Sequence, residues 1–305
     1  MIATADYELL KTKVGLVDRS ARGKLTVRGA DAADFLQGQV TNDVEALAPG
    51  EGCYAAMLSH KGKFRTDMRI LRTDDGFWMD TEPIGLVPAR WTLETYAIGR
   101  DVQHEDVTGR MAILSLVGPA AREALDVAPP ETEHGHVVGE HGRYVATDLG
   151  VDVICERDAA EAVKAALGVP EVGEEVAEVL RIESGRPRLG YDMDAETMPQ
   201  EAGVHERAVS YTKGCYVGQE TVARLYWKGK PNRHLRGLRL SEPVERGAEL
   251  RLGEKVVGRV GSACVSPAHG PIALALVRRE AEPGDTLAVG DGGATAEVVE
   301  LPFGS

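Results

Sequence analysis

The alternation of apolar and polar positions predicts a chain of many short strands with a few helices between them. Lys24–Arg28 alternates as a half-buried strand does, and Gly29 ends it. Asp31 stands at the N-cap position of an apolar-periodic helix at 32–37. Further strands are predicted at Cys53–Ser59, Phe64–Leu71, Gly76–Asp80, Met111–Val117 and Val151–Cys155, and further helices at Ile84–Ile98 and Ala159–Leu167. Pro88 must then lie in the first turn of its helix or break it.

The pattern changes near residue 235, where short alternating strands punctuated by Gly and Pro begin to follow one another. These strands are predicted at Leu235–Leu240, Glu249–Leu252, Val256–Cys264, Ile272–Val277, Thr286–Val289 and Ala294–Leu301. They predict a small all-β barrel or sandwich. We place the domain boundary near Pro231-Asn232, which divides the chain into an α+β region at 1–230 and a β domain at 231–305.

The segment Glu174–Gly185 has a clear helical period and carries an unusual acidic residue. Val176, Leu180 and Glu183 fall at i, i+4 and i+7, on one face of a helix, and Gly185 stands at the expected C-terminal cap. A carboxylate on an apolar face is costly unless it is paired or bound to a ligand. Glu183 is therefore either a buried hydrogen-bonding group for a heterocycle with adjacent N–H donors, or the partner of Arg181, Arg186 or Arg188 in an ion pair.

Composition and charge exclude several classes of protein. The chain has 305 residues, of which 43% are hydrophobic and 27% charged, as in ordinary globular proteins. No run of about 18 apolar residues is present, so we expect no membrane span. The first residues lack the features of an export signal, so we expect a cytoplasmic protein. Four widely separated cysteines argue against a disulfide framework, a zinc site or a metal cluster held by this chain alone.

The formal net charge of −13 argues against generic nucleic-acid binding, which needs clustered Lys and Arg. One block nevertheless departs from this acidity, because the segment from Arg224 to Arg239 contains six cations and no acidic residue. It is either a binding surface for an anionic ligand or partner, or a solvated basic face.

The most distinctive motif is the run Lys213-Gly214-Cys215-Tyr216-Val217-Gly218-Gln219-Glu220. Its two glycines allow a tight turn or a close approach of backbone to a ligand, and a helix is predicted to begin at Gln219. Positive charge and a helix N-terminus both favour the thiolate of a nearby cysteine. Cys215 is therefore either a functional thiol on a shaped turn or a small buried cysteine in a Gly-rich connection.

This run resembles the signature of the YgfZ family, folate-binding proteins of iron–sulfur cluster maintenance. That family is related in fold to the T-protein, the aminomethyltransferase of the glycine cleavage system. The stretch at 180–187 resembles the superfamily's Leu-Arg-Leu-Glu-Ala-Gly segment, whose glutamate holds the pterin ring of folate. The resemblance spans most of the chain. It implies the α+β aminomethyltransferase-like folate-binding fold, with two intertwined α/β subdomains and a C-terminal small β-barrel.

One departure from the superfamily pattern bears on activity. Aminomethyltransferases carry a Gly-Gly-x-x-Asp-Asp stretch, in which we take the first aspartate to be catalytic. The matching segment here is Gly62–Asp67, where Thr66 replaces the first aspartate and Asp67 remains as the second. A threonine cannot supply the same acid–base chemistry at neutral pH. The chain also lacks a clear Gly-Tyr-Thr-Gly-Glu run, and both differences argue against the glycine-cleavage reaction.

Taken with the resemblance, the residues predict a tetrahydrofolate-binding protein that supports assembly or repair of iron–sulfur proteins. Its partners would be the folate, or a derivative, and iron–sulfur client or assembly proteins. The resemblance assigns Glu183 to the pterin and Cys215 to a functional thiol in one shared pocket.

Asp67, Lys213 and Gln219 are weaker candidates in that pocket, and the basic block beginning at Arg224 would meet the glutamate tail. No metal site is expected. Two alternatives stay open. One is a folate-dependent aminomethyltransferase or other one-carbon transferase, and the other is a folate-free module that binds RNA or a protein.

Overall fold

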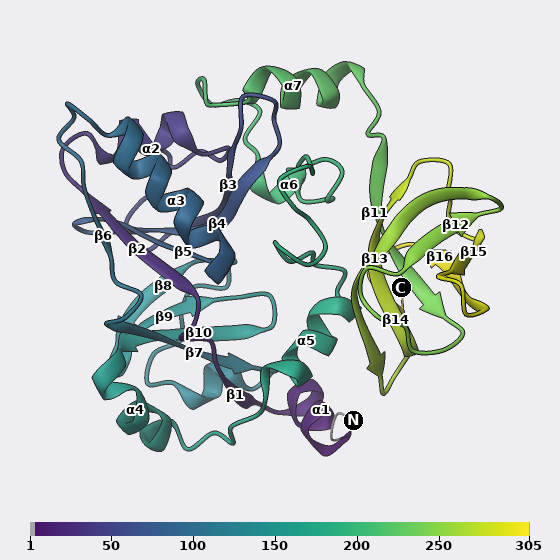
Figure 1. The fold of residues 1–305 in the computed structure, drawn as a ribbon. Coiled ribbons are helices and arrows are strands. Elements are labelled where there is room, and N and C mark those ends of the chain that lie inside the picture. Colours follow the sequence, from purple (N-terminus) through teal and green to yellow (C-terminus); the bar gives the residue numbers. More distant parts are fainter. Residues whose placement is uncertain (1–3, 305) are drawn as a thin grey trace.

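The computed structural model describes residues 4–304 and arranges them as two five-stranded sheets and a closed six-stranded barrel (Figure 1). The first sheet has the strand order β3-β4-β5-β2-β6, with antiparallel neighbours. Its strands are β2 (Gly23–Arg28), β3 (Gly52–Leu58), β4 (Phe64–Thr73), β5 (Gly76–Thr81) and β6 (Gln103–Asp106).

Two helices, α2 (Ala32–Gln39) and α3 (Pro83–Tyr96), cover one face of this sheet (Figure 1). Phe35 of α2 and Leu93 of α3 are buried in one core with Leu25 and Ile70 of the strands. Burying a large apolar side chain contributes roughly 1.5–3 kcal/mol. The alternation of the strands therefore directs one set of side chains toward α2 and α3 and the other set toward the rest of the molecule.

The second sheet has the order β1-β7-β10-β9-β8 and packs against the first. Leu71 and Trp78 of the first sheet share a core with Ile113, Val145 and Ile154 of the second. Its strands are β1 (Gly15–Asp18), β7 (Met111–Val117), β8 (His136–Gly139), β9 (Gly142–Ala146) and β10 (Gly150–Glu156). Because β1 precedes the whole first sheet in the sequence, the two sheet units are intertwined.

Helices and short turns complete this region. The helix α4 (Ala160–Leu167) packs on the second sheet through Val163. Two short 3₁₀ turns, at Ala121–Ala124 and Arg157–Ala159, follow β7 and β10. A long connection at 186–204 leads to α6 (His205–Ala208) and then to α7 (Gln219–Lys228).

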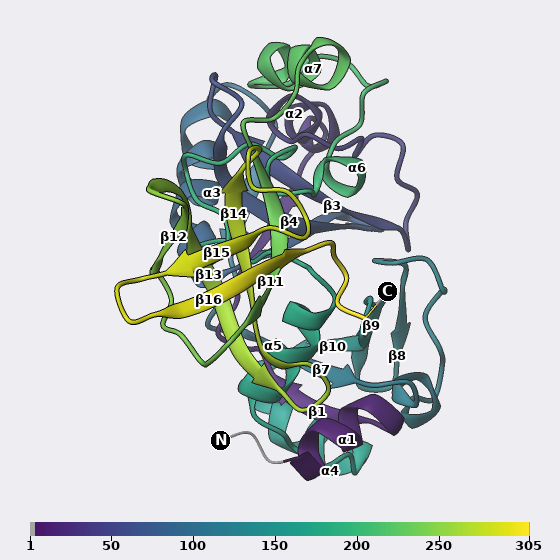
Figure 2. The same ribbon diagram turned by 90° about the vertical axis from the view of Figure 1, so that its right-hand side faces the viewer.

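The barrel closes in the order β11-β14-β13-β12-β15-β16 and confirms the predicted C-terminal fold. Its strands are β11 (Arg233–Leu240), β12 (Glu249–Leu252), β13 (Lys255–Ser266), β14 (Gly270–Arg278), β15 (Thr286–Val289) and β16 (Ala294–Val299). Ile272 and Leu274 of the barrel pack with Ile182 of the helix α5 (Glu174–Glu183), so this helix joins the barrel to the sheets (Figure 2).

The helix α5 has two different faces, and this difference positions the candidate site. Val176 and Leu180 pack against Tyr7 of α1 (Thr4–Thr12). Glu174, Glu178 and Arg181 follow one another at i, i+4 and i+7 and line a cavity on the other side. Gly185 has φ +75°, which fits the C-terminal cap predicted for it.

Two local predictions were wrong. Asp31 precedes α2 but makes no capping bond, because its Oδ2 accepts the backbone N–H of Asp101 at 2.8 Å. Pro88 lies inside α3 without breaking it. The carbonyl that a proline there leaves unbonded belongs to Ile84, an exposed residue, so water can hydrate it. No helix in the described part of the chain is both long and apolar enough to span a membrane.

Candidate functional site

A cavity of about 390 Å³ lies between the two sheets, and we call it the central cavity. The strands β3, β4 and β5 supply one wall and β10 another, while α5 and the segment after it close a third side. Tyr54, Asp67 and Arg69 line it from the first sheet. Its size falls within the range of small-molecule sites.

Asp67 is the unusual group of this cavity. Its side chain is buried, and the Tyr54 hydroxyl donates a hydrogen bond to its Oδ2 at 2.6 Å. Burial raises the pKa of Asp67, although the Tyr54 hydrogen bond opposes the shift. Every other carboxylate that lines the cavity forms an ion pair with a lysine or an arginine, whereas Asp67 forms none with any described residue.

The neighbouring Thr66 faces the opposite side of the sheet. Its Oγ1 lies 3.0 Å from Oγ1 of Thr81, and a Cβ added to Gly85 of α3 would stand 2.2 Å from it. Successive side chains of a strand point to opposite faces, so Thr66 and Asp67 cannot both reach the cavity. The replacement at Thr66 therefore affects the contact with α3, and the argument that it removes a catalytic acid from the site was wrong.

A network of buried ion pairs holds the cavity walls together. Arg69 Nε lies 2.7 Å from Oδ2 of Asp80 on β5, and its Nη1 lies 2.7 Å from Oδ2 of Asp152 on β10. Arg22 also reaches Asp80 at 3.0 Å. Arg69 thus connects the two sheets at the cavity wall through its Nε and Nη1, while its buried Nη2 has no hydrogen-bond partner among the described residues.

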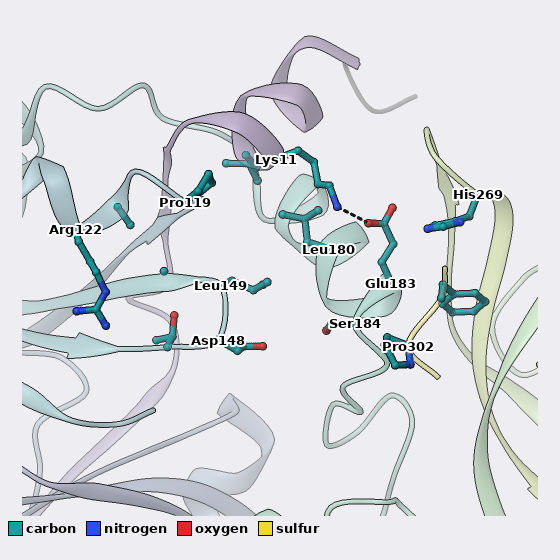
Figure 3. A pocket seen from close by; sticks show the side chains of 16 residues that line it. Lys11, Pro119, Arg122, Asp148, Leu149, Leu180, Glu183, Ser184, His269 and Pro302 are labelled. Carbon is teal, nitrogen blue, oxygen red and sulfur yellow. Dashed lines mark ion pairs between the residues drawn. The ribbon is translucent and has the colours of Figure 1, made fainter. Parts of the chain in front are cut away.

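Glu183 is buried, as predicted, but it lines a second cavity of about 510 Å³ (Figure 3). Tyr7 Oη donates to Oε1 at 2.9 Å, and Ser266 Oγ donates to the same oxygen at 2.6 Å. Lys11 Nζ lies 3.9 Å from Oε2. Its neighbours are therefore not the arginines considered from the sequence, and the buried carboxylate connects α1, α5 and the barrel.

The two cavities share one wall. Thr147, Asp148 and Leu149, in the turn between β9 and β10, line both of them. Asp148 lies beside Leu149 at the edge of the second cavity in Figure 3. A ligand longer than either cavity could therefore contact both on the two sides of this turn.

Lys213 lies away from both cavities and is bonded to the end of another helix. Its Nζ donates to the backbone carbonyls of Gln37 at 2.6 Å, Val40 at 2.8 Å and Asn42 at 2.9 Å. The last carbonyls of a helix lack intrahelical partners, and a cation is favourable there. Burial lowers the pKa of Lys213 to about 8. Its amine fixes the 213–218 loop against the end of α2.

The structure does not bring Cys215 and Glu183 into one pocket. Cys215 is exposed and lines neither cavity. Gly218, with φ +87°, is the N-cap residue before α7, and a Cβ there would stand 2.5 Å from the carbonyl oxygen of Ser59. Gln219 and Arg224 lie on α7, outside the lining of both cavities.

Sequence reasoning missed Tyr54, Glu178 and Arg69 in the central cavity. A signal for two of them was present. Arg69 lies two positions after Asp67 on a strand, and therefore on the same face. Glu178 belongs to the polar stripe of α5, on the side opposite its apolar stripe.

Comparison with known proteins gives consistent matches. Residues 2–141 match the model of the GCVT N-terminal domain, and residues 233–304 match that of the glycine cleavage T-protein C-terminal barrel domain. A probable aminomethyltransferase of Natronomonas pharaonis is 31% identical over 98% of this chain and 89% of its own length. An aminomethyltransferase of Prosthecochloris aestuarii is 29% identical over 98% and 90%.

A putative chloroplastic transferase of Arabidopsis thaliana is 28% identical over 95% of this chain and 71% of its own length. The crystal structure of the glycine cleavage system aminomethyltransferase T from Bartonella henselae superposes with a TM-score of 0.89 at 22% identity. The superposition covers 98% of this chain and 88% of that one, which establishes the shared fold.

Proposed function

The chain belongs to the glycine cleavage T-protein (aminomethyltransferase) family, and from that premise we propose that it binds a reduced folate in the central cavity, with its pterin against Asp67. One observation supports this proposal above the others. Asp67 is a buried carboxylate that faces a cavity of ligand size and has no cationic partner among the described residues.

A pterin offers the hydrogen-bond donors that could pair with the carboxylate of Asp67. A pterin carries adjacent N–H donors on its 2-amino group and its N3, and a carboxylate can accept hydrogen bonds from both. Tyr54 already donates to Oδ2 of Asp67 and helps to fix the orientation of the carboxylate. Because burial raises the pKa of Asp67, donors from a ligand would stabilise its charged form.

Calorimetry with tetrahydrofolate tests the binding site. We expect wild-type protein to bind, and Asp67→Asn to bind at least about tenfold more weakly, because one donor–acceptor pair with a charged group is lost. Glu297→Gln, which changes an exposed carboxylate on the barrel, is the matched control and should bind as wild type does. Absence of any binding heat with wild-type protein would contradict the proposal.

We further propose that the bound folate serves the assembly or repair of iron–sulfur proteins. The resemblance of the 213–220 run to the YgfZ signature supports this role, and the exposed position of Cys215 leaves its thiol accessible to a partner protein. The test is the activity of an iron–sulfur enzyme in cells that lack this protein and receive a variant. Cys215→Ser and Asp67→Asn should both fail to restore it, whereas Cys155→Ser should restore it, and full recovery with Cys215→Ser would remove the thiol from the proposal.

Transfer of a one-carbon unit is the second candidate, and the orientation of Asp67 favours it. An acidic side chain faces the cavity at the stretch where the resembling aminomethyltransferases carry Asp-Asp, and curated relatives are named aminomethyltransferases. The test incubates the protein with tetrahydrofolate and an aminomethyl-loaded carrier protein. Release of ammonia together with methylenetetrahydrofolate would support transfer, and its absence while folate binds would support the iron–sulfur role alone.

A further inference from the structure

The two cavities have complementary charge properties. In the central cavity each arginine forms an ion pair with a carboxylate, and Asp67 is the carboxylate that forms no ion pair with any described residue. In the second cavity the acids are the groups already satisfied. Glu183 accepts hydrogen bonds from Tyr7 and Ser266, and Asp148 pairs with Arg186 at 2.7 Å.

The cations of the second cavity are less well compensated. Among the residues that the structure describes, Arg122 bonds only to the backbone carbonyls of Pro129 and Pro130, which carry no net charge. Lys11 is half exposed, and within residues 4–304 its only carboxylate contact is the 3.9 Å approach to Glu183. Figure 3 shows Lys11 and Arg122 on different sides of this cavity, from α1 and from the 3₁₀ turn after β7.

We propose that the second cavity receives the carboxylate-bearing tail of the folate whose pterin lies against Asp67. This inference rests on the proposed function. The ligand would pass the turn at Thr147–Leu149, which lines both cavities, so that its neutral N–H donors lie at the unpaired acid and its carboxylates at Lys11 and Arg122. The basic block beginning at Arg224, to which the sequence assigned the tail, lines neither cavity.

Apolar surface on the path suits the middle of such a ligand. Leu149 lies on the shared wall, and Leu180, Pro119 and Phe303 line the second cavity. The aromatic ring between a pterin and a glutamate would be removed from water there, at roughly 25 cal/mol for each Å² of apolar surface buried. The pterin end of the ligand would then lie at Asp67, and its carboxylate end would lie at Lys11 and Arg122.

The test compares three ligands by calorimetry: tetrahydrofolate, its triglutamate form, and 6-methyltetrahydropterin, which has the pterin but no tail. The variant Lys11→Gln/Arg122→Gln should weaken binding of both tailed ligands at least about tenfold and leave the pterin unchanged. Lys11→Gln alone is a second variant, chosen because this side chain is half exposed, and it should act in the same direction. Arg279→Gln, an exposed arginine on the barrel, is the control.

The outcomes separate the two proposals. Equal binding of all three ligands by variant and wild type would overturn the placement of the tail while leaving folate binding intact. An equal loss for the tailed ligands and for the pterin would also overturn it, because the substitutions would then act on the pterin site. Failure of the wild type to bind any of the three ligands would instead refute the proposed function.

Discussion

Replacing Arg69 with methionine should destabilise the protein strongly, because this side chain connects the two sheets. Its guanidinium lies 2.7 Å from Asp80 and 2.7 Å from Asp152, and all three side chains are buried. After the substitution Asp80 keeps Arg22 at 3.0 Å, whereas the one side-chain partner that Asp152 keeps among the described residues is the hydroxyl of Ser115 at 2.6 Å. Removing one partner of a buried ion pair costs about 3–5 kcal/mol.

Urea unfolding followed by tryptophan fluorescence measures this cost, since Trp78 Nε1 donates to Asp80 at 3.2 Å and reports on the same contact. Adding Asp152→Asn to Arg69→Met should recover part of the loss, because the uncompensated charge is then removed. Arg28→Met is the matched control. Its ion pair with Asp75 is at the surface, where such a pair contributes about 0–1 kcal/mol. If Arg69→Met and Arg28→Met unfold at the same urea concentration, the argument is refuted.

Three other substitutions test separate parts of the structure. Lys213→Met should lower the free energy of unfolding by about 2 kcal/mol, because buried carbonyls at the end of α2 lose their donor, while the exposed Lys228→Met changes nothing measurable. Gly218→Ala should lower the free energy of unfolding by about 1–3 kcal/mol, because its φ of +87° and the nearby Ser59 carbonyl disfavour a Cβ. The control Gly214→Ala places its Cβ in open space and should unfold as the wild type does in thermal denaturation. Burial and the nearby Arg143 lower the pKa of His136 to about 4. Between pH 6.5 and 4 this histidine is therefore protonated in the unfolded chain and neutral in the folded chain. The free energy of unfolding should therefore fall as the pH is lowered from 6.5 to 4. His136→Gln should reduce this fall by about 3 kcal/mol, which urea titrations at several pH values would detect or exclude.

Local patterns were sufficient for much of the fold. The six barrel strands, β2 to β5 of the first sheet, β7 and β10 of the second, and the helix α5 were predicted from their patterns, whereas the shorter strands β1, β6, β8 and β9 were not. Because side chains alternate along a strand, the sequence already implied that Asp67 and Thr66 face opposite sides of the sheet. A comparison of motifs alone does not take this alternation into account. A motif aligns positions along the chain, whereas the pleat of β4 determines which of two neighbours faces the cavity.

The contacts that define the candidate site come from residues far apart in the sequence. Tyr7 and Glu183 are separated by 176 positions, and Lys213 bonds to Gln37 across the same separation. Local sequence patterns do not predict contacts between residues so far apart in the chain. The sequence indicated correctly that Glu183 is buried, but its partners depend on how α1 and the barrel pack around α5. The exposure of Cys215 likewise follows from the way Lys213 fixes its loop to α2.

A crystal structure of the protein with tetrahydrofolate bound is the most direct test of the central claim. We predict density for the pterin in the central cavity, with its 2-amino group and N3 about 3 Å from the carboxylate oxygens of Asp67. Density for the pterin against Glu183, on the other side of the Thr147–Leu149 turn, would contradict that claim.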